Sequence, residues 1–259
     1  MAAEHKDKIR HVVWPRLREV AIPDSRFHYE FSSFIADFQG SDRATERLCL
    51  LPCYVNAKVV FITPDNCLEK LRYQALCDGK KVLVTTYAIR RGFWLLDPAV
   101  VKTPEQRQMA SLLDAMERPG LGRHITLAEM QDMGLKVDLM VTGTGAINHA
   151  GIRFGKGHGF FDLEWAMLTS INVVELAVPC IAVVHDCQVL DEQLHPEVFD
   201  TVCDFIVTPS TIKEAAEQGA VQKPSCGILW DKLQPGMLED IPPLQELRRL
   251  TTTKATQGP

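Results

Sequence analysis

The sequence lacks an excess of positive charge, since 28 Lys and Arg stand against 33 Asp and Glu in 259 residues, a net charge of −5. An acidic chain has no general attraction to nucleic acid, so such binding would need a local basic patch or another domain. No run of eighteen apolar residues occurs, so we expect no transmembrane helix and no membrane partner. The polar opening MAAEHKDKIR lacks the apolar centre of a signal peptide, and we expect an intracellular protein, cytoplasmic or nuclear.

Cysteine pairs of the CxxC type are also missing, although the chain has eight cysteines. Most of them lie in apolar or strand-like runs such as LCLLPCYV and VPCIAVVHDC, a pattern typical of reduced, buried thiols in an intracellular protein. A metal site at Cys49 and Cys53 would lack a second ligand pair. The composition, 46% hydrophobic and 24% charged, is that of a globular chain long enough to build a core.

Short runs rich in Val, Ile and Leu alternate with amphipathic stretches along the chain. The runs predict strands at 58–63, 80–86, 137–143, 180–186 and 204–209. The stretches predict helices at 65–79, 103–117, 126–134 and 210–219. Because the strand runs are apolar on both faces, we expect helices to cover both sides of the sheet. The prediction is an α/β fold, a three-layer sandwich with a mostly parallel, Rossmann-like sheet.

Proline and polar residues suggest where the regular fold begins and ends. The first fifty residues are helical in pattern, but Pro15 and Pro23 should interrupt them. We expect the α/β domain at 5–218, a C-terminal extension packed on it at 219–250, and a flexible tail or the start of a linker at 251–259.

The stretch GIRFGKGHGFFDLEWAML, residues 151–168, carries the strongest functional signal. Glycines at alternate positions let backbone N–H groups converge on an anion, and a helix that begins there adds its positive end. Arg153 and Lys156 suit phosphate, whereas Asp162 suits phosphate only when Mg²⁺ lies between them. A tight strand-to-helix turn with solvated charges is the alternative interpretation. The stretch is neither a Walker loop nor the dinucleotide GxGxxG pattern.

The order G-x-R-x-G-x-G-x-G-[aromatic]-[aromatic]-D is more specific than its glycines alone. It resembles the signature of the 5-formyltetrahydrofolate cyclo-ligase family, also called methenyltetrahydrofolate synthetase. The N-terminal KDKIR, the strand VDLMV before the loop and the segment CIAVVHDCQVLDEQLHPEVFDTVCDFIVTP after it agree with this resemblance. It covers residues 5–218 and implies a cyclo-ligase-like α/β domain over that range.

The resemblance implies an ATP- and Mg²⁺-dependent reaction of a reduced folate. In the family the formyl oxygen of 5-formyltetrahydrofolate is phosphorylated, N10 attacks the activated carbon, and phosphate leaves. The nucleotide-binding candidates that it implies are Lys6, Arg10, Arg153, Gly155, Lys156, Gly157, His158 and Gly159. The metal candidates are Asp162 and Asp200, and the substrate candidates are Asp65, Phe160 and Phe161; no catalytic residue is assigned.

Each group of candidates also has a structural interpretation. Lys6 and Arg10 are compatible with a solvated helix face, Asp200 with an ordinary loop acid, and Asp162 with charge complementation at a helix N-terminus. Histidines such as His158 are more often structural than catalytic.

Several positions depart from the family pattern. Phe160 and Phe161 replace two tyrosines, Phe199 stands where His is common, and Asn148 replaces an Asp. Asp65 stands where a Glu anchors the folate and is one methylene shorter, so we expect weak or absent turnover, as in a pseudo-enzyme.

A second hypothesis is a non-catalytic interaction domain of an RNA-binding protein. Its RNA-recognition motif would lie beyond this chain, because no RNP-like aromatic sequence occurs in these 259 residues.

Overall fold

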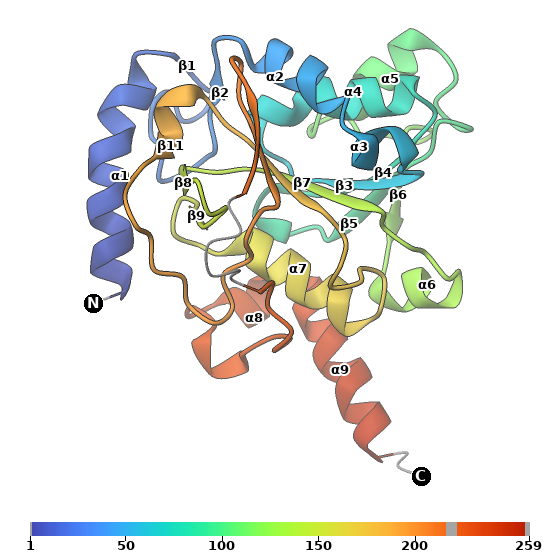
Figure 1. Cartoon of the computed structure of the whole chain (residues 1–259). Coiled ribbons are helices and arrows are strands. Elements are labelled where there is room, and N and C mark those ends of the chain that lie inside the picture. The colour runs from blue at the N-terminus through green and yellow to red at the C-terminus, as the bar shows by residue number, and fades with distance from the viewer. Residues whose placement is uncertain (1, 216–221, 257–259) are drawn as a thin grey trace.

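The computed structural model describes residues 2–215 and 222–256, and within them an eight-stranded sheet forms the centre of the molecule (Figure 1). Its order is β13-β12-β10-β7-β3-β4-β5-β6. The parallel strands are β3 (Val59–Ile62), β4 (Lys81–Thr85), β7 (Leu139–Gly143), β10 (Cys180–Val183) and β12 (Phe205–Val207). Antiparallel strands extend both edges, namely β5 (Phe93–Leu96), β6 (Gly122–Ile125) and β13 (Ile212–Glu214). Every run predicted as a strand contains one of the parallel strands.

Helices cover both faces of this sheet, which confirms the predicted three-layer α/β fold (Figure 1). One layer contains α2 (Ser41–Leu48), α3 (Pro52–Asn56), α4 (Glu69–Cys77) and α5 (Pro104–Ser111). The other contains α6 (Leu127–Asp132), α7 (Phe160–Ser170), α8 (Met237–Asp240) and α9 (Pro242–Thr256). Short 3₁₀ turns occur at η1 (Asn66–Leu68), η2 (Tyr87–Ile89), η3 (Asp186–Gln188) and η4 (Trp230–Lys232).

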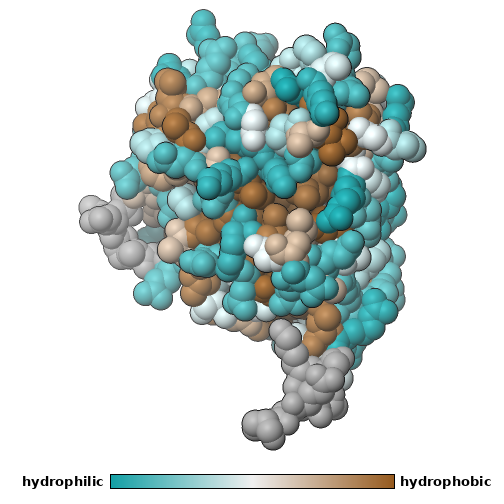
Figure 2. Space-filling model, turned by 90° about the vertical axis from the view of Figure 1, so that its right-hand side faces the viewer, coloured by the Kyte–Doolittle hydropathy of each residue, from teal (hydrophilic) through white to brown (hydrophobic). Residues whose placement is uncertain are grey.

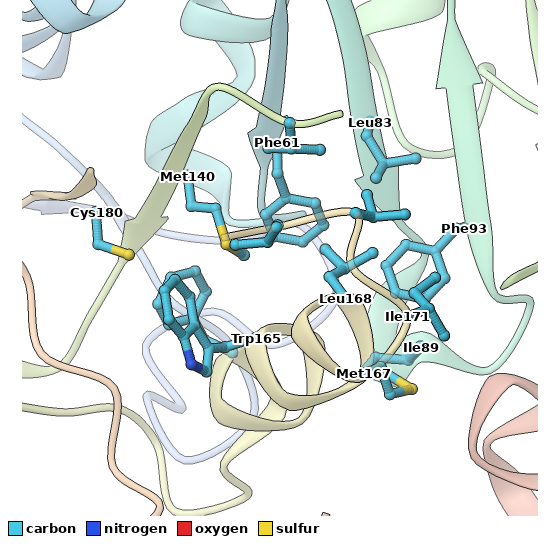
Figure 3. Packing of buried hydrophobic residues seen from close by; sticks show 14 of the residues in the cluster. Phe61, Leu83, Ile89, Phe93, Met140, Trp165, Met167, Leu168, Ile171 and Cys180 are labelled. Atoms are coloured by element: carbon cyan, nitrogen blue, oxygen red, sulfur yellow. The ribbon is translucent and has the colours of Figure 1, made fainter. Parts of the chain in front are cut away.

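The alternation of side chains along the strands divides the core into two halves. Phe61 is in register with Met140 and Leu83, so these three side chains form one row on the α7 face of the sheet. Trp165 and Leu168 of α7 pack against that row (Figure 3). Burying a large apolar side chain of this kind contributes about 2–3 kcal/mol, so the row fixes α7 firmly on the sheet.

The N-terminal helix α1 (Ala2–Arg18) lies outside the two layers, beside a small sheet of order β11-β8-β9 (Figure 1). The strands of that sheet are β8 (Ala146–Asn148), β9 (Arg153–Phe154) and β11 (Val189–Leu190). Ile9 and Val13 of α1 pack against Phe154 and Leu190. After α1, β1 (Ala21–Ile22) pairs with β2 (Asp37–Phe38).

Two predictions about local structure were wrong. Pro15 does not interrupt α1, which continues through it to Arg18, although its missing N–H costs the helix one hydrogen bond. The helix predicted at 210–219 is replaced at its start by β13, which pairs antiparallel with β12. The β-branched Thr211 and Ile212 favour an extended backbone there, and the unpaired edge of β12 supplies the partner. Residues 216–221 lie outside the described part of the chain.

The C-terminal segment packs on the α7 side of the sheet. Leu244 and Leu247 of α9 are buried in the core beside α7. The Glu246 carboxylate accepts hydrogen bonds from the N–H groups of Leu127 (3.0 Å) and Ala128 (2.9 Å) at the start of α6. The helix continues through residue 251, the predicted start of the tail, as far as Thr256; residues 257–259 lie outside the described part.

The surface on the side away from α1 is hydrophilic around its margin, with hydrophobic residues gathered near its centre (Figure 2). Among the described residues, no helix combines the length and the apolar character that a membrane crossing requires.

Candidate functional site

A cavity of about 550 Å³ opens where the sheet, α1 and the first turn of α7 meet. It lies at the carboxyl ends of β3, β4 and β7, the usual place for a ligand in an open α/β sheet. All thirteen site candidates from the sequence line it: Lys6, Arg10, Asp65, Arg153, Gly155, Lys156, Gly157, His158, Gly159, Phe160, Phe161, Asp162 and Asp200. Residues separated by almost two hundred positions are thus brought to one place.

The glycine loop, residues 155–159, joins β9 to α7 along one wall of the cavity. Gly157 and Gly159 have φ values of 114° and 68°, in the left-handed region that favours glycine. Gly159 is the N-cap of α7, and its carbonyl accepts the first helical hydrogen bond from Leu163 N–H (3.0 Å). The loop therefore leads directly into the positive end of an eleven-residue helix.

Arg153 and Asp162 form a buried ion pair at the base of this loop. Arg153 Nη2 donates to Asp162 Oδ1 at 2.6 Å, and the N–H of Thr201 donates to the same oxygen at 2.8 Å. The guanidinium lies 4.4 Å from the ring centre of Phe161. Burial raises the pKa of Asp162, and Arg153 opposes that rise. Burial would lower the pKa of Arg153, but it is raised because Asp162 stabilises the charged form.

The two cations from α1 are held just as closely. Lys6 Nζ lies 2.7 Å from Asp200 Oδ2 and 2.8 Å from Glu197 Oε2, and it faces the Phe199 ring at 5.6 Å. Arg10 Nε donates to the carbonyl of Gly155 at 2.9 Å and so fixes the start of the glycine loop. Neither side chain belongs to a solvated helix face, because both are largely buried between α1 and the loop.

A second part of the cavity is aromatic. Lys156 Nζ lies 4.9 Å from the ring centre of Tyr87 and 5.5 Å from that of Phe160, and donates to the carbonyl of Ser33 at 3.2 Å. Burial lowers the pKa of Lys156, and the carboxylates of Asp65 and Glu164 oppose that shift. His158 stacks on Phe160 with ring centres 5.3 Å apart, and burial lowers its pKa. A flat ligand ring would find planar partners here.

Asp65 lies between the ends of two neighbouring strands. Its Oδ2 atom accepts hydrogen bonds from Gly143 N–H at the end of β7 (2.8 Å) and from the Thr63 hydroxyl after β3. Burial raises the pKa of this carboxyl. One oxygen of Asp65 is therefore occupied in joining the strands before any ligand enters.

Sequence reasoning missed Glu164, which also lines the cavity. Its side chain is buried, accepts a hydrogen bond from the Thr85 hydroxyl at the end of β4, and has its pKa raised to about 8 by burial. Phe161, Glu164, Trp165 and Leu168 follow helical spacing, so Glu164 lies on the apolar stripe of α7. A carboxyl on such a stripe is the signal that could have identified it.

A wall of the cavity formed by the C-terminal segment was also missed. Its lining residues are Gly227, Ile228, Leu229, Lys232, Leu233, Gln234 and Met237. Gln234 Nε2 donates to the carbonyl of Gly157 at 2.9 Å, which places this segment directly on the glycine loop.

Cationic and carboxyl side chains line the cavity in equal numbers, but the pKa of Glu164, raised to about 8, leaves that carboxyl largely protonated at neutral pH, so the lining carries net positive charge. The lining contains six cationic side chains (Lys6, Arg10, Arg26, Arg153, Lys156, Lys232) and six carboxyls (Asp7, Asp65, Asp162, Glu164, Glu197, Asp200). Within the described residues, no group of three or more His, Cys, Asp and Glu side chains is arranged to hold a metal ion. Asp162 and Asp200 are carboxylates of the kind that binds Mg²⁺ when a ligand supplies further oxygens, but Asp162 already pairs with Arg153 and Asp200 with Lys6, so a metal ion would bind there only in exchange for those contacts.

Asn148, one of the positions that depart from the family pattern, has local structural partners. Asn148 Oδ1 accepts hydrogen bonds from the N–H groups of Ala150 and Ile152, both at 3.1 Å, and shapes the turn before β9.

All eight cysteines are free, and burial raises the pKa of Cys49 and of Cys53. A thiolate is the form that binds metal, so this pair is poorly suited to a metal site.

The fold and the cavity together define an α/β domain with a candidate ligand site, in which a glycine loop and several cations lie at the carboxyl end of a parallel sheet. The chain belongs to the 5-formyltetrahydrofolate cyclo-ligase family, whose model matches residues 2–209.

Curated relatives bear the name methenyltetrahydrofolate synthase domain-containing protein. The Danio rerio relative is 33% identical over 251 residues, 95% of this chain and 62% of the relative. The Homo sapiens relative is 31% identical over 245 residues, 94% of this chain and 61% of the relative. This chain thus spans about three fifths of the length of these relatives.

Solved structures with a similar chain path include the 5,10-methenyltetrahydrofolate synthetase of Aquifex aeolicus, with a TM-score of 0.49 and 16% identity over 86% of this chain and 99% of that chain. The synthetase of Mycoplasma pneumoniae has a TM-score of 0.45 and 12% identity, over 78% of this chain and 97% of that chain.

Proposed function

We propose that this cyclo-ligase-like domain binds ATP with Mg²⁺ and a reduced folate in its cavity, and that its cyclo-ligase turnover is weak or absent. The observation that carries the proposal is the composition of the cavity. A cationic glycine loop at a helix N-terminus and an aromatic compartment with its own carboxyls share one space of about 550 Å³.

The glycine loop is suited to the phosphates. Backbone N–H groups around Gly157 and the N-terminus of α7 favour an anion, and Arg153 and Lys156 add full charges. Asp162 and Asp200 would hold Mg²⁺ against the phosphates in exchange for their contacts with Arg153 and Lys6, and the ion would neutralise part of the phosphate charge. These side chains position the nucleotide, which is the main contribution a protein makes to phosphoryl transfer.

The aromatic compartment is suited to the flat ring of a folate. Phe160, Phe161 and Tyr87 line it, and Asp65 offers the carboxyl that stands in place of the family's Glu. Asp65 is one methylene shorter and is already bound to Gly143 and Thr63. A misplacement of about 1 Å can cost on the order of a hundredfold in rate, which supports binding with little turnover.

The alternative hypothesis is that this domain serves a larger RNA-binding protein, and the greater length of the relatives is compatible with it. The chain covers only 61–63% of their length, so an RNA-recognition motif beyond it stays a prediction.

Eight free thiols fit a reducing, intracellular compartment, cytoplasmic or nuclear.

Calorimetric titration with ATP, with and without Mg²⁺, tests nucleotide binding. We expect binding that depends on Mg²⁺, and Arg153→Ala should weaken it about ten- to a hundredfold, the loss of a charge-assisted contact of roughly 1.5–3 kcal/mol. Because that variant leaves Asp162 buried and unpaired, Gly157→Val provides a second test, and Lys8→Met is the control at an exposed position of α1. No ATP binding by the wild-type protein under either condition would refute the nucleotide assignment.

Turnover is tested separately by following methenyl absorbance with purified protein, ATP, Mg²⁺ and 5-formyltetrahydrofolate. Rates equal to those of an active family enzyme measured beside it would refute the expectation of weak turnover.

A further inference from the structure

The C-terminal wall of the cavity, here called the strap (residues 222–237), lies beyond the region that the family model matches, although the curated relatives match 94–95% of the chain. That region ends at residue 209. The strap is nevertheless fixed firmly at its start, where Lys223 Nζ lies 2.6 Å from Asp204 Oδ2 and the Trp165 indole donates to the carbonyl of Pro224 at 2.8 Å. At its other end Met237 is buried in the main core. The strap is therefore a built part of the site.

The middle of the strap crosses the glycine loop. The Gln234 side chain donates to the Gly157 carbonyl at 2.9 Å, and the short turn η4 before it brings Lys232 to the rim of the cavity. A ligand anion held by the loop would therefore lie close to a cation of the strap.

Lys232 differs from most other cations of the cavity in having no acidic partner. Lys6, Arg10, Arg26 and Arg153 each have a carboxylate oxygen within 4.0 Å. In the described ranges 2–215 and 222–256, Lys232 has neither an ion pair nor a side-chain hydrogen bond.

An incoming phosphate would compete with a bound carboxylate at each of the paired cations. At Lys232 it would gain attraction without breaking an existing pair. Lys156 also lacks an acidic partner within that distance, but it lies between two rings and donates to Ser33. Among the described lining residues, Lys232 is thus the cation whose side chain can turn toward a bound phosphate without losing an ion pair or a hydrogen bond.

We propose that Lys232 binds a phosphate of the nucleotide, and that Gln234 is a positioning residue that holds the strap on the glycine loop. This inference rests on the proposed function and deepens it, because the nucleotide site would then combine the region that the family model matches with a segment C-terminal to it.

Calorimetric titration with MgATP at low and high salt tests the role of Lys232. Lys232→Met should weaken binding about three- to tenfold at low salt, and less at high salt, because the contact is partly exposed. The control is Lys8→Met, which removes the same charge at an exposed position of α1 and should bind as the wild type does. Equal affinities for the Lys232→Met and Lys8→Met proteins would overturn the proposal.

A double-mutant cycle tests whether Gln234 acts through Lys232. Gln234→Leu should weaken MgATP binding on its own, but it should add little when Lys232→Met is already present. Fully additive losses would overturn the positioning role. Thermal unfolding midpoints close to the wild-type value would show that neither change acts by destabilising the fold.

Titration with 5-formyltetrahydrofolate alone separates the phosphate from other anions. Lys232→Met should leave this affinity unchanged, and a loss confined to the folate titration would overturn the phosphate assignment. Absence of MgATP binding by the wild-type protein would refute the proposed function and this inference together. Wild-type binding with an unaffected Lys232→Met protein would refute the inference alone.

Discussion

Replacing Glu164 with Gln should remove much of the pH dependence of this protein's stability. Glu164 is 1% exposed, and its carboxyl meets the Thr85 hydroxyl in the core between α7 and β4. Burial raises its pKa from an ordinary 4.5 to about 8, so the folded protein keeps a proton that the unfolded chain loses near pH 4.5. Gln is close in shape and does not ionise.

The sign and size of the effect follow from proton linkage. A folded-state pKa above the unfolded one contributes stability that is complete below pH 4.5 and is lost as pH rises through about 8. The slope approaches about 1.4 kcal/mol per pH unit, and between pH 6 and pH 8 the loss amounts to about 2 kcal/mol. Asp65 and Asp162, whose pKa values burial also raises, titrate in both proteins and largely cancel in the comparison.

Urea unfolding at pH 6 and pH 8 measures this difference within each protein. Between pH 6 and pH 8 the free energy of unfolding of the wild type should fall by about 2 kcal/mol more than that of the Glu164→Gln protein. In thermal unfolding the same difference corresponds to about 4–8 °C in midpoint for a chain of this size. Glu175→Gln, at a side chain that is 73% exposed, is the matched control and should follow the wild type. Equal pH dependence in the wild-type and Glu164→Gln proteins would refute the reasoning, because Glu164 would then not be protonated in the folded state.

Three further changes test the framework around the site, each by urea unfolding. Gly151→Ala should lower the free energy of unfolding by about 3 kcal/mol or more, because Gly151 has a φ of 75° and an added Cβ would overlap the Cys203 carbonyl oxygen. The control Gly134→Ala, at a φ of 60° with open space around the added Cβ, should cost only about 1 kcal/mol. Equal costs for the two variants would contradict the argument. Arg72→Met should cost about 3 kcal/mol or more, since the buried guanidinium donates to the carbonyls of Ser111, Thr63 and Asp65; a cost below about 1 kcal/mol would mean that water replaces it. Thr126→Ala should cost about 1 kcal/mol by opening the capping box of α6, and a neutral result would show that Glu246 suffices at that helix end.

The central sheet was predictable because its strands are buried on both faces. Runs such as VVFI and LMVTG are apolar throughout, and only a covered parallel sheet accommodates them. The antiparallel strands were not predicted, because β6 reads GRHI and is mostly polar and exposed. Its extended form depends on its pairing with β5, which a local pattern does not reveal.

The residues of the candidate site fall into the same two groups, those with a local sequence signal and those whose position depends on the folded chain. The glycine loop and its neighbours were found because their order in the sequence is itself the signal. Glu164 and the strap were missed because their place in the cavity depends on packing. Glu164 resembles an ordinary charge in the second turn of a helix, and Gln234 lies in an irregular segment. Asp65 was predicted as a substrate-side residue and lines the cavity, but its bonds to Gly143 and Thr63 depend on strands that meet only in the folded sheet.

The ion pair between Lys6 and Asp200 also determines when, during synthesis, the site can form. Its partners are 194 positions apart, and the apolar side of α1 packs on Phe154, Leu190 and Val202, which are nearly as distant. At about 5–20 residues per second, a ribosome needs roughly 10 to 40 s to add the intervening chain. During that time α1 has no partner surface, and its apolar residues are open to chaperones. A fusion or tag that holds the first residues away from the growing domain should therefore impair the cavity more than one placed at the C-terminus.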